Sequence, residues 1–492
     1  MGVTLNMSYE AVIGLEVHAE LATRSKMFCA CPVVDSTQAQ PNTAVCPVCA
    51  GMPGMLPVVN RQAVEYALRV ALALECTVNT TSIFARKNYF YPDLPKGYQI
   101  SQYEQPLARH GRLAILTSQG DRIVRIRRVH LEEDTGKLTH VEGPGEAYSL
   151  VDLNRAGVPL LEIVTEPDLH SAEEVRAYAT ALRSLLRYLG VNSGDMQKGV
   201  MRIEPNVSVR PAGSAEFGTR TEIKNLNSFR ALERSVDYEI QRQSELLRQG
   251  LAVEQQTLGW DDAREVTLPQ RSKEEAHDYR YFPEPDLPPL VLDDAWVEEV
   301  RLSLPELPAA RYRRFCQQYG LNAYDAELLT AERAVADYFE SVLAAAGASP
   351  KTVANWIGSE LFALLNHAGE NIEAGRVTAP ALAELIQMVG GGEINHNTAK
   401  SVLAEMYRSG ASAKQIVAAG GLGQISDASL IASLVEQVLR ENPQQVESYL
   451  NGKEGLARWL FGQVMRAAQG RADPQVIQQE LDRQLAGLYK AN

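Results

Sequence analysis

Acidic residues and a histidine alternate along one segment near the start of the chain. Between Val12 and Leu21, single apolar residues separate Glu16, His18 and Glu20. In an extended strand, residues two apart point to the same side, so these three side chains would share one face. Carboxylate oxygens and an imidazole nitrogen within reach of one cation would suit Mg²⁺ shared with ATP phosphates. The alternative is a strand whose polar face is merely solvated.

The segment 201–210 repeats this alternation with both charges. It places Arg202, Glu204 and Asn206 on one side of a predicted strand. Because Pro205 has no amide hydrogen, it limits this strand to a sheet edge, a first position or a bulge.

A third strand of this kind is predicted over residues 219–227. Arg220, Glu222 and Lys224 fall on one face of it. Their cations would suit phosphate oxygens or a substrate carboxylate.

A fourth strand is predicted over residues 125–134. If it stays extended, Arg128, His130 and Glu132 share one face and Glu133 lies on the other. The two-residue alternation favours Glu132 for the polar site. A turn at the end of the strand would bring Glu133 to that face instead, so both glutamates are candidates.

The segment 152–162 adds polar residues at the end of one strand and within the next, namely Asp152, Asn154, Arg155 and Glu162. Several strands that supply Glu, His and Arg to one face would form the floor of a metal and nucleotide site. We favour this interpretation over a set of separate solvated faces.

Aromatic and basic residues are concentrated between Arg86 and Gln99, among them Lys87 and Lys96. The prolines predict an irregular loop, and loops of this kind often carry function. The loop could stack an adenine or guide a small polar molecule, or its aromatic residues could pack on the domain surface.

Four of the six cysteines form two close pairs, Cys29-x-Cys31 and Cys46-x₂-Cys49. This spacing is compatible with tetrahedral Zn²⁺, and four thiolates leave no open position, so the metal would be structural. Reduced cysteines without metal are the alternative. Six cysteines in so long a chain do not make a disulfide framework, and together with the metal-like pairs they indicate a reducing compartment.

The 492 residues predict more than one domain. Period-two segments with helical stretches such as 171–189 indicate an α+β domain over residues 1–293, with the cysteine segment 29–49 as an insert. It ends after a proline-rich segment that cannot be helical. Good helix formers then predict an all-α domain over residues 294–409 and a small α-helical tail over residues 410–492. Asn442-Pro443 and Asp473-Pro474 mark two helix starts.

The formal net charge of −13 argues against binding nucleic acid by bulk electrostatics. Residues 401–492 hold nine Lys or Arg and nine Asp or Glu, so this neutral segment is the least repulsive place for RNA. We expect a cytoplasmic protein without a membrane partner, since the first residues do not resemble a signal peptide and no apolar run approaches the roughly 20 residues of a span.

Several motifs together resemble the B-subunit (GatB) family of the glutamine-dependent aspartyl/glutamyl-tRNA amidotransferases. They are IGLEVHAEL, the cysteine pairs followed by AGMPGMLPVVN, KNYFYPDLPKGYQISQ, HLEEDTGK, DLNRAGVPLLEIVTEPD, MRIEPNVSV, TEIKNLNSF, HDYRYFPEPDLPP and, near the end of the chain, QISD, ENPQ, NGK and GRADPQ.

The resemblance implies a cradle-shaped catalytic domain whose sheet is similar to that of glutamine synthetase, then a helical domain and a tail that contacts tRNA. It implies a heterotrimer with an amidase (glutaminase) A subunit and a small C subunit, and makes a non-discriminating aminoacyl-tRNA synthetase a candidate further partner. The chain itself shows no P-loop, GxGxxG or GxSxG motif and no glutaminase nucleophile, so another protein must make the ammonia. The resemblance implies that the A subunit makes it and that it travels through an internal channel.

By the same resemblance, Glu16 and His18 with Glu132 or Glu133 match metal-binding positions for Mg²⁺. Further motif positions line the same cradle without separate assignment to catalysis, ATP or substrate: Glu162, Arg155, Arg202, Glu204, Asn206, Glu222 and Lys224. Lys87 and Lys96 match the loop near the channel mouth and the phosphates. One departure from the family pattern is Glu204-Pro205, where an Asp followed by a β-branched residue is expected. This departure puts in doubt whether that strand supplies a metal ligand.

The implied reaction is attack of the aminoacyl carboxylate of Asp-tRNA(Asn) or Glu-tRNA(Gln) on the γ-phosphate of ATP, followed by ammonia displacing phosphate. Two rivals stay open from the residues alone. One is a non-catalytic zinc-ribbon scaffold that docks tRNA to an enzyme, and the other is an ammonia-using ligase that acts on a small molecule.

Overall fold

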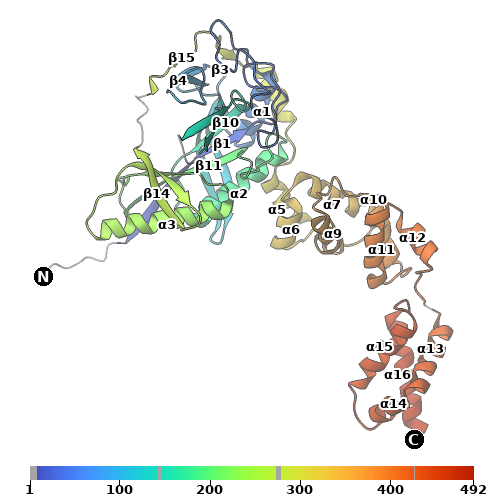
Figure 1. The fold of residues 1–492 in the computed structure, drawn as a ribbon. Helices are drawn as coiled ribbons and strands as arrows, with labels where there is room; N and C mark the ends of the chain where they lie inside the picture. Colours follow the sequence, from blue (N-terminus) through green and yellow to red (C-terminus); the bar gives the residue numbers. More distant parts are fainter. Residues whose placement is uncertain (1–7, 142–146, 273–278, 426, 492) are drawn as a thin grey trace, which may run out of the picture. The chain divides into compact units, whose positions relative to one another are not determined.

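The computed structural model describes residues 8–141, 147–272, 279–425 and 427–491. It divides into two compact units, the first ending at Ala310 and the second beginning at Arg311 (Figure 1). Two residues of the HDYRYFPEPDLPP motif, His277 and Asp278, and Ser426 of QISD lie outside the described residues.

A nine-stranded mixed sheet forms the centre of the first unit. Its strand order is β14–β13–β12–β11–β1–β10–β7–β6–β2, antiparallel except for the parallel β12–β13 pair. The strands are β1 (Tyr9–Glu20), β2 (Thr77–Val78), β6 (Ala108–Thr117), β7 (Gly120–Glu133), β10 (Pro159–Thr165), β11 (Met201–Pro211), β12 (Thr221–Lys224), β13 (Gln256–Asp261) and β14 (Val266–Ser272).

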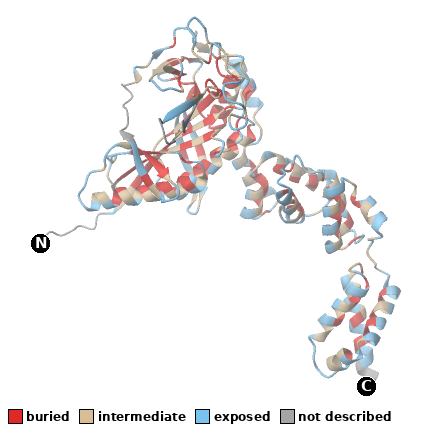
Figure 2. Ribbon diagram, in the orientation of Figure 1, coloured by how far each residue is buried: buried red, intermediate tan, exposed pale blue. Residues whose placement is uncertain are grey.

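Three helices supply the partners of the sheet's apolar face: α1 (Arg61–Ala73), α2 (Ala172–Tyr188) and α3 (Phe229–Arg248). In β1, Ile13, Leu15 and Val17 are almost fully buried in this core, while the alternate residues are only partly buried. Figure 2 shows this burial concentrated where strands and helices meet. The predicted period-two pattern therefore holds, and it leaves the polar side chains of β1 on the face opposite the helices.

The predicted helix over 171–189 is confirmed as α2. Ser171 caps its start by accepting a hydrogen bond from the amide of Glu174 (3.2 Å), and Leu189 ends it. Capping by a serine side chain satisfies one of the backbone donors that the first helical turn leaves unpaired.

Three smaller sheets flank the main one: β15 (Phe282–Pro283), β4 (Ala85–Asn88) and β5 (Tyr98–Ser101); β16 (Leu290–Val291) and β3 (Thr81–Ser82); β8 (Lys137–Val141) and β9 (Tyr148–Asp152). The prediction of an irregular loop over residues 86–99 was wrong at both ends. Arg86–Asn88 pairs with Tyr98–Ile100 in an antiparallel ladder, and residues 89–97, which include both prolines, form the irregular connection between the two strands.

The prediction that Pro205 limits its strand to a sheet edge, a first position or a bulge was also wrong. β11 lies inside the sheet, where Pro205 pairs with Leu15 of β1. On the other side, the register with β12 covers only Asn206 and Val207 and stops before the proline. The missing amide donor therefore falls beyond the end of the short neighbouring ladder.

The second unit is helical, as predicted, and holds two separate hydrophobic clusters. Helix α4 (Asp294–Leu302) instead contributes to the core of the first unit. The helices that follow are α5 (Pro308–Gln318), α6 (Ala323–Thr330), α7 (Arg333–Ala346), α8 (Pro350–Asn355), the π-helix η2 (Trp356–Leu361), α9 (Phe362–Ala368), α10 (Ala379–Gly390), α11 (His396–Ser409), α12 (Ala413–Gly420), α13 (Ala428–Glu441), α14 (Pro443–Leu450), α15 (Leu456–Ala467) and α16 (Pro474–Ala491). The predicted boundaries at residues 293/294 and 409/410, and the likeness to glutamine synthetase, stay predictions.

Both proline-marked helix starts are confirmed, but only one cap acts as expected. Asp473 accepts from the amide of Gln475 at 2.8 Å, whereas the Asn442 side chain donates backward to Val438 O at 2.7 Å. Asn442 therefore closes the preceding helix rather than capping the next one. Among the described helices, none combines the length and apolar composition needed to cross a bilayer.

Candidate active site

Strand register brings the polar side chains of four strands into one row. His18 in β1 lies opposite Arg202 of β11 on one side and Glu162 of β10 on the other, and Glu162 lies opposite His130 of β7. Directly opposed residues on one face of an antiparallel sheet have their Cβ atoms about 5 Å apart. The row therefore places each of these four residues directly beside its neighbour on the next strand.

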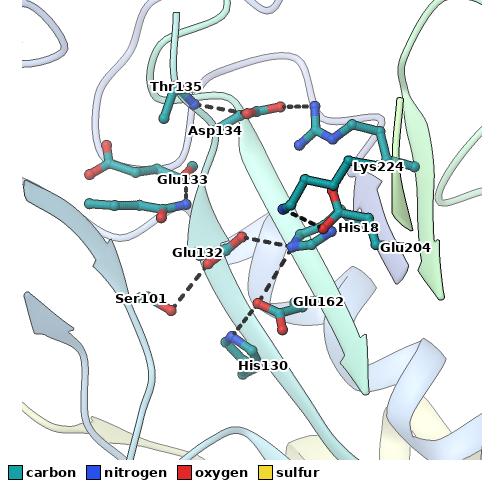
Figure 3. Close-up of polar contacts among 12 residues, drawn as sticks. His18, Ser101, His130, Glu132, Glu133, Asp134, Thr135, Glu162, Glu204 and Lys224 are labelled. Carbon is teal, nitrogen blue, oxygen red and sulfur yellow. Dashed lines mark hydrogen bonds and ion pairs between the residues drawn. The ribbon is translucent and has the colours of Figure 1, made fainter. Parts of the chain in front are cut away.

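The histidine–carboxylate cluster, made of His18, His130, Glu132 and Glu162, is the centre of this row (Figure 3). His18 Nε2 lies 3.6 Å from Glu162 Oε2 and 3.8 Å from Glu132 Oε1, and His130 Nε2 lies 3.0 Å from Glu162 Oε2. Ser101 Oγ donates to Glu132 at 3.2 Å. The Nδ1 atoms of both histidines are buried and have no hydrogen-bond partner among the described residues.

Burial and crowding separate the proton affinities in this cluster. Burial, and then the charge of Glu162, raise the pKa of Glu132. Burial would also raise the pKa of Glu162, but His130 and His18 outweigh it and hold that pKa well below its usual value. For His18, burial acts to lower the pKa, but Glu162 and the other carboxylates raise it to about 9. Such divergence among neighbouring groups is typical of functional sites.

A second group, the carboxylate–lysine cluster of Glu16, Glu204, Glu222 and Lys224, lies on the same face. One carboxylate oxygen from each of the three glutamates lies within 4.8 Å of the others. Lys224 Nζ lies 2.8 Å from Glu204 and 3.5 Å from Glu222, and Asn206 Nδ2 donates to Glu16 at 3.0 Å. Burial acts to lower the pKa of Lys224, but Glu204 and Glu222 outweigh it and raise the pKa.

A third group surrounds Asp134 at the end of β7. Arg202 donates to Asp134 Oδ2 at 2.9 Å, and Arg155 Nε lies 3.7 Å from the same oxygen. The two guanidinium groups overcome burial and hold the pKa of Asp134 below its usual value. Burial, and then the charge of Asp134, raise the pKa of Glu20 to about 8.

Parity correctly separated Glu132 from Glu133. Glu133 turns away from the histidine–carboxylate cluster, pairs with Lys96 and accepts from the amide of Ile100 at 2.9 Å.

Lys87 lies within 4.8 Å of the ring centroid of Tyr279. Burial acts to lower the pKa of Lys87, but Tyr281, Glu132 and other negative groups outweigh it and raise the pKa.

The four paired cysteines meet in one place, because the sulfur atoms of Cys29, Cys31, Cys46 and Cys49 all lie within 4.8 Å of one another. Cys49 Sγ lies 4.0 Å from Cys31 Sγ and 3.9 Å from Cys46 Sγ. Lys26, a fully buried lysine, contacts Cys49 Sγ at 3.5 Å and donates to Leu153 O at 3.2 Å. A hydrogen bond from Cys29, with Lys26 nearby, lowers the pKa of Cys49 to about 4.

The structure divides the predicted Mg²⁺ residues between two groups. His18 and Glu132 come together with Glu162, whereas Glu16 joins Glu204 and Glu222. Alternation predicted that Glu16 and His18 share a face, but their partners depend on which strands flank β1.

Two further residues belong to the candidate site and were given no individual role from the sequence, although His130 was placed on the polar face with Glu132. His130 could have been assigned one, because it shares the parity of Glu132 on the same predicted strand. Asp134 follows the end of β7, where parity gives no guidance, and only the long-range approach of Arg202 reveals it.

Both acidic groups fit a cation chemically. Three carboxylates at Glu16, Glu204 and Glu222 form the all-oxygen donor set that hard cations prefer. His18, Glu132 and Glu162 offer one nitrogen and two carboxylates. The cysteine group offers the four sulfur ligands of a closed zinc site, and Lys26 lies against one of them.

Comparison with known proteins matches both units. The model of the GatB/GatE catalytic domain matches residues 11–298, and that of the GatB domain matches residues 337–485. The B subunit of the aspartyl/glutamyl-tRNA(Asn/Gln) amidotransferase from Moorella thermoacetica is 54% identical over 481 residues, 97% of this chain and 100% of the relative. The chain belongs to the GatB family.

Other members of the family are similarly close. The proteins of the same description from Thermodesulfovibrio yellowstonii and Oleidesulfovibrio alaskensis are each 52% identical, over 96% and 95% of this chain and 98% of each relative. The GatB/GatE match contains both acidic groups and the cysteine group, so the whole candidate site lies in the family's catalytic domain.

Proposed function

We propose that this chain is the B subunit of an aspartyl/glutamyl-tRNA(Asn/Gln) amidotransferase, a carbon–nitrogen ligase that converts Asp-tRNA(Asn) or Glu-tRNA(Gln) to the amidated product. The observation that carries the proposal is the pair of acidic groups, side by side on the polar face of the sheet, within the region that matches the family's catalytic domain.

The chemistry has two steps. The terminal carboxylate oxygen of the esterified Asp or Glu attacks the γ-phosphorus of ATP, the bond to the β-phosphate oxygen breaks, and ADP leaves. Ammonia then attacks the carbonyl carbon of the acyl phosphate, phosphate leaves with the bonding electrons, and a proton passes from nitrogen to a base. Enclosure of the acyl phosphate would keep water from hydrolysing it.

This chain's residues would hold the groups that such chemistry needs. Glu16, Glu204 and Glu222 would hold one Mg²⁺, and His18, Glu132 and Glu162 are a second candidate set. The metal supplies charge neutralisation for the phosphates. Arg155 and Arg202, beside Asp134, would orient anionic oxygens, and Lys87 and Lys96 would face the phosphate and ammonia side.

The cysteine group would hold structural Zn²⁺, with Lys26 offsetting part of the thiolate charge. The proposed partners are an amidase A subunit, a small C subunit and misacylated tRNA, which the last helices of the chain would contact, with a non-discriminating aminoacyl-tRNA synthetase as a further partner. We place this assembly in the cytoplasm.

The test is phosphate release from ATP by the chain reconstituted with its amidase partner, with and without Asp-tRNA bearing the Asn anticodon or Glu-tRNA bearing the Gln anticodon. We expect release that depends on the misacylated tRNA and is lost in Glu16→Ala and His18→Ala. Glu298→Ala is the matched control, because Glu298 is exposed on α4 and pairs only with Arg301 among the described residues. Release that is absent, or indifferent to Glu16 and His18, would favour the scaffold.

A further inference from the structure

A cavity of about 380 Å³ lies beside the histidine–carboxylate cluster, outside the groups described above. Its wall comes from the junction of β3 and β4, the segment after β5 and the segment around β15, and includes Ile83, Tyr103, Gln105, Arg280, Tyr281 and Phe282. This volume is in the range of small-molecule sites, roughly 300 to 1,000 Å³.

Two tyrosines form a flat aromatic wall in this cavity. The rings of Tyr103 and Tyr281 stack with centroids 4.1 Å apart and planes inclined by 8°. Tyr103 keeps 39% of its surface exposed, so this pair is not closed off by packing. Parallel aromatic rings with an accessible surface are a common platform for a nucleobase.

Three polar side chains line the cavity beside this wall and have no polar partner among the described residues. Among the residues that the structure describes, none hydrogen-bonds or ion-pairs with the side chains of Glu104, Gln105 or Arg280, all of which line the cavity. A glutamine amide offers the donor and acceptor pair that matches the amino group and ring nitrogen of adenine. A guanidinium can stack on the base or bind phosphate. The cavity thus combines a stacking surface with hydrogen-bonding edges.

The cavity adjoins the reacting centre. Ser101 donates to Glu132, and Tyr103 follows two residues later, so their Cα atoms lie within about 7 Å. Arg128 lies 6.0 Å from the Tyr103 ring centroid and donates to Gln102 O. Burial raises the pKa of Tyr281 to about 12; Lys87 acts to lower this pKa, and the charges of Glu132 and Glu162 act to raise it, which is consistent with a ring facing both the cavity and the cluster.

We propose that this cavity is an adenosine site, in which the base lies against the stacked Tyr103–Tyr281 pair and its edge meets Gln105. The inference rests on the proposed function, in which both substrates carry adenosine. ATP brings one, and the misacylated tRNA brings the terminal nucleotide to which its amino acid is esterified.

The experiment measures the KM for ATP and the KM for misacylated tRNA in tRNA-dependent phosphate release by the reconstituted enzyme. The variants are Tyr103→Leu, Gln105→Ala and Tyr103→Phe, with Tyr324→Leu on α6 as control, because Tyr324 is 73% exposed. Loss of base stacking should raise the affected KM roughly tenfold in Tyr103→Leu. Tyr103→Phe, which keeps the ring, should recover most of what Tyr103→Leu loses, and Tyr324→Leu should leave the KM unchanged.

The two KM values identify the source of the adenosine. If ATP occupies the cavity, only the KM for ATP rises, and Gln105→Ala lowers the preference for ATP over inosine triphosphate, which lacks the amino group. If the tRNA terminus occupies it, only the KM for tRNA rises. Unchanged KM values in a Tyr103→Leu/Gln105→Ala double variant would overturn the proposal.

Failure of the proposed function would look different. The unsubstituted chain would then show no tRNA-dependent phosphate release at all. In that case, Mg-ATP binding by calorimetry to the unsubstituted chain and to the double variant would test the cavity independently. Equal affinities, or no binding to either, would overturn the adenosine site.

Discussion

Carboxylates lie among cations in two regions of this chain, the candidate active site and the α5–α7 region of the second unit, and they are paired very differently. In the α5–α7 region, Glu340 accepts from Arg314 at 2.6 Å and from Tyr319 at 2.7 Å, and it also pairs with Arg311. Arg311 in turn lies 2.6 Å from Asp337. Each carboxylate here faces a cation.

In the candidate active site, carboxylates face one another across a shared imidazole. Glu132 and Glu162 lie 3.8 and 3.6 Å from His18 Nε2, and the Nδ1 atoms of His18 and His130 have no partner among the described residues. The pKa of Glu132 is raised while that of Glu162 is lowered. A fully paired group becomes costly to the fold when one partner is removed, whereas crowding that separates neighbouring pKa values is typical of a site for a cation or a proton.

The largest effect that tests this contrast is expected from Glu132→Gln. The amide keeps the shape of the side chain but removes a charge that the fold itself crowds against Glu162. We expect tRNA-dependent phosphate release to fall by roughly 10²- to 10³-fold, as for loss of one electrostatic stabiliser. The free energy of unfolding should change by less than about 1 kcal/mol or increase. A variant that loses both activity and stability would contradict this division of roles.

The reverse result is expected from Glu340→Gln. This change leaves Arg311 and Arg314 without their shared carboxylate and should destabilise the second unit by about 2 to 4 kcal/mol. Urea denaturation followed by circular dichroism gives the difference. Activity per folded molecule should stay unchanged at temperatures where the unit is folded, so a selective loss of turnover would place Glu340 in the reaction and break the comparison.

In the cysteine group, charge pairing is intermediate between that of the two regions. One buried ammonium, that of Lys26, faces a cluster of four sulfur atoms. Lys26→Met removes the ammonium from Cys49 Sγ and from Leu153 O. We expect zinc affinity, measured by competition with a chelator, to fall roughly tenfold to a hundredfold, as for loss of an outer hydrogen bond at a metal site. Lys26→Arg should recover part of it. Equal zinc affinity in Lys26→Met would make the lysine a packing residue.

Faces of strands were predictable from the sequence, and partners across strands were not. Alternation alone placed Glu132 and Glu133 on opposite sides, because the two-residue period is local. The grouping of Glu16 with Glu222 depends on the strand order β12–β11–β1, which residues far apart in the chain determine. For the same reason, Pro205 inside the sheet and the stack of Tyr103 on Tyr281 had no local signal.

The cysteine spacing predicted all four members of the cysteine group, whereas alternation predicted only which residues share a face of one strand. Cys29 and Cys31, like Cys46 and Cys49, are close in sequence, so only one loop closure must bring the pairs together. Lys26 was not predicted, because nothing in its neighbours shows that the ammonium would be buried against Cys49. The sequence therefore revealed the four candidate metal ligands, but not the lysine whose charge lies against them.

The smallest effect is the pH dependence of the α5–α7 region. Burial would raise the pKa of Glu340, but Arg314, Tyr319 and Arg311 lower it to about 2 from its ordinary 4.5. Because the folded-state pKa lies below the unfolded one, the associated stability is fully present above pH 4.5 and is lost as pH falls toward 2. The loss should be about 1 to 2 kcal/mol, less than the full shift implies, since the carboxylate reaches solvent.

Comparing Glu340→Gln with the unsubstituted chain isolates this effect. The difference in the free energy of unfolding of the second unit, from urea titrations at pH 6, 4.5, 3.5 and 2.5, should shrink as pH falls, because protonated Glu340 increasingly resembles the amide. A difference that is constant over this range would mean that Glu340 acts through packing rather than charge. The pairing that distinguishes this region from the active site would then have no electrostatic basis.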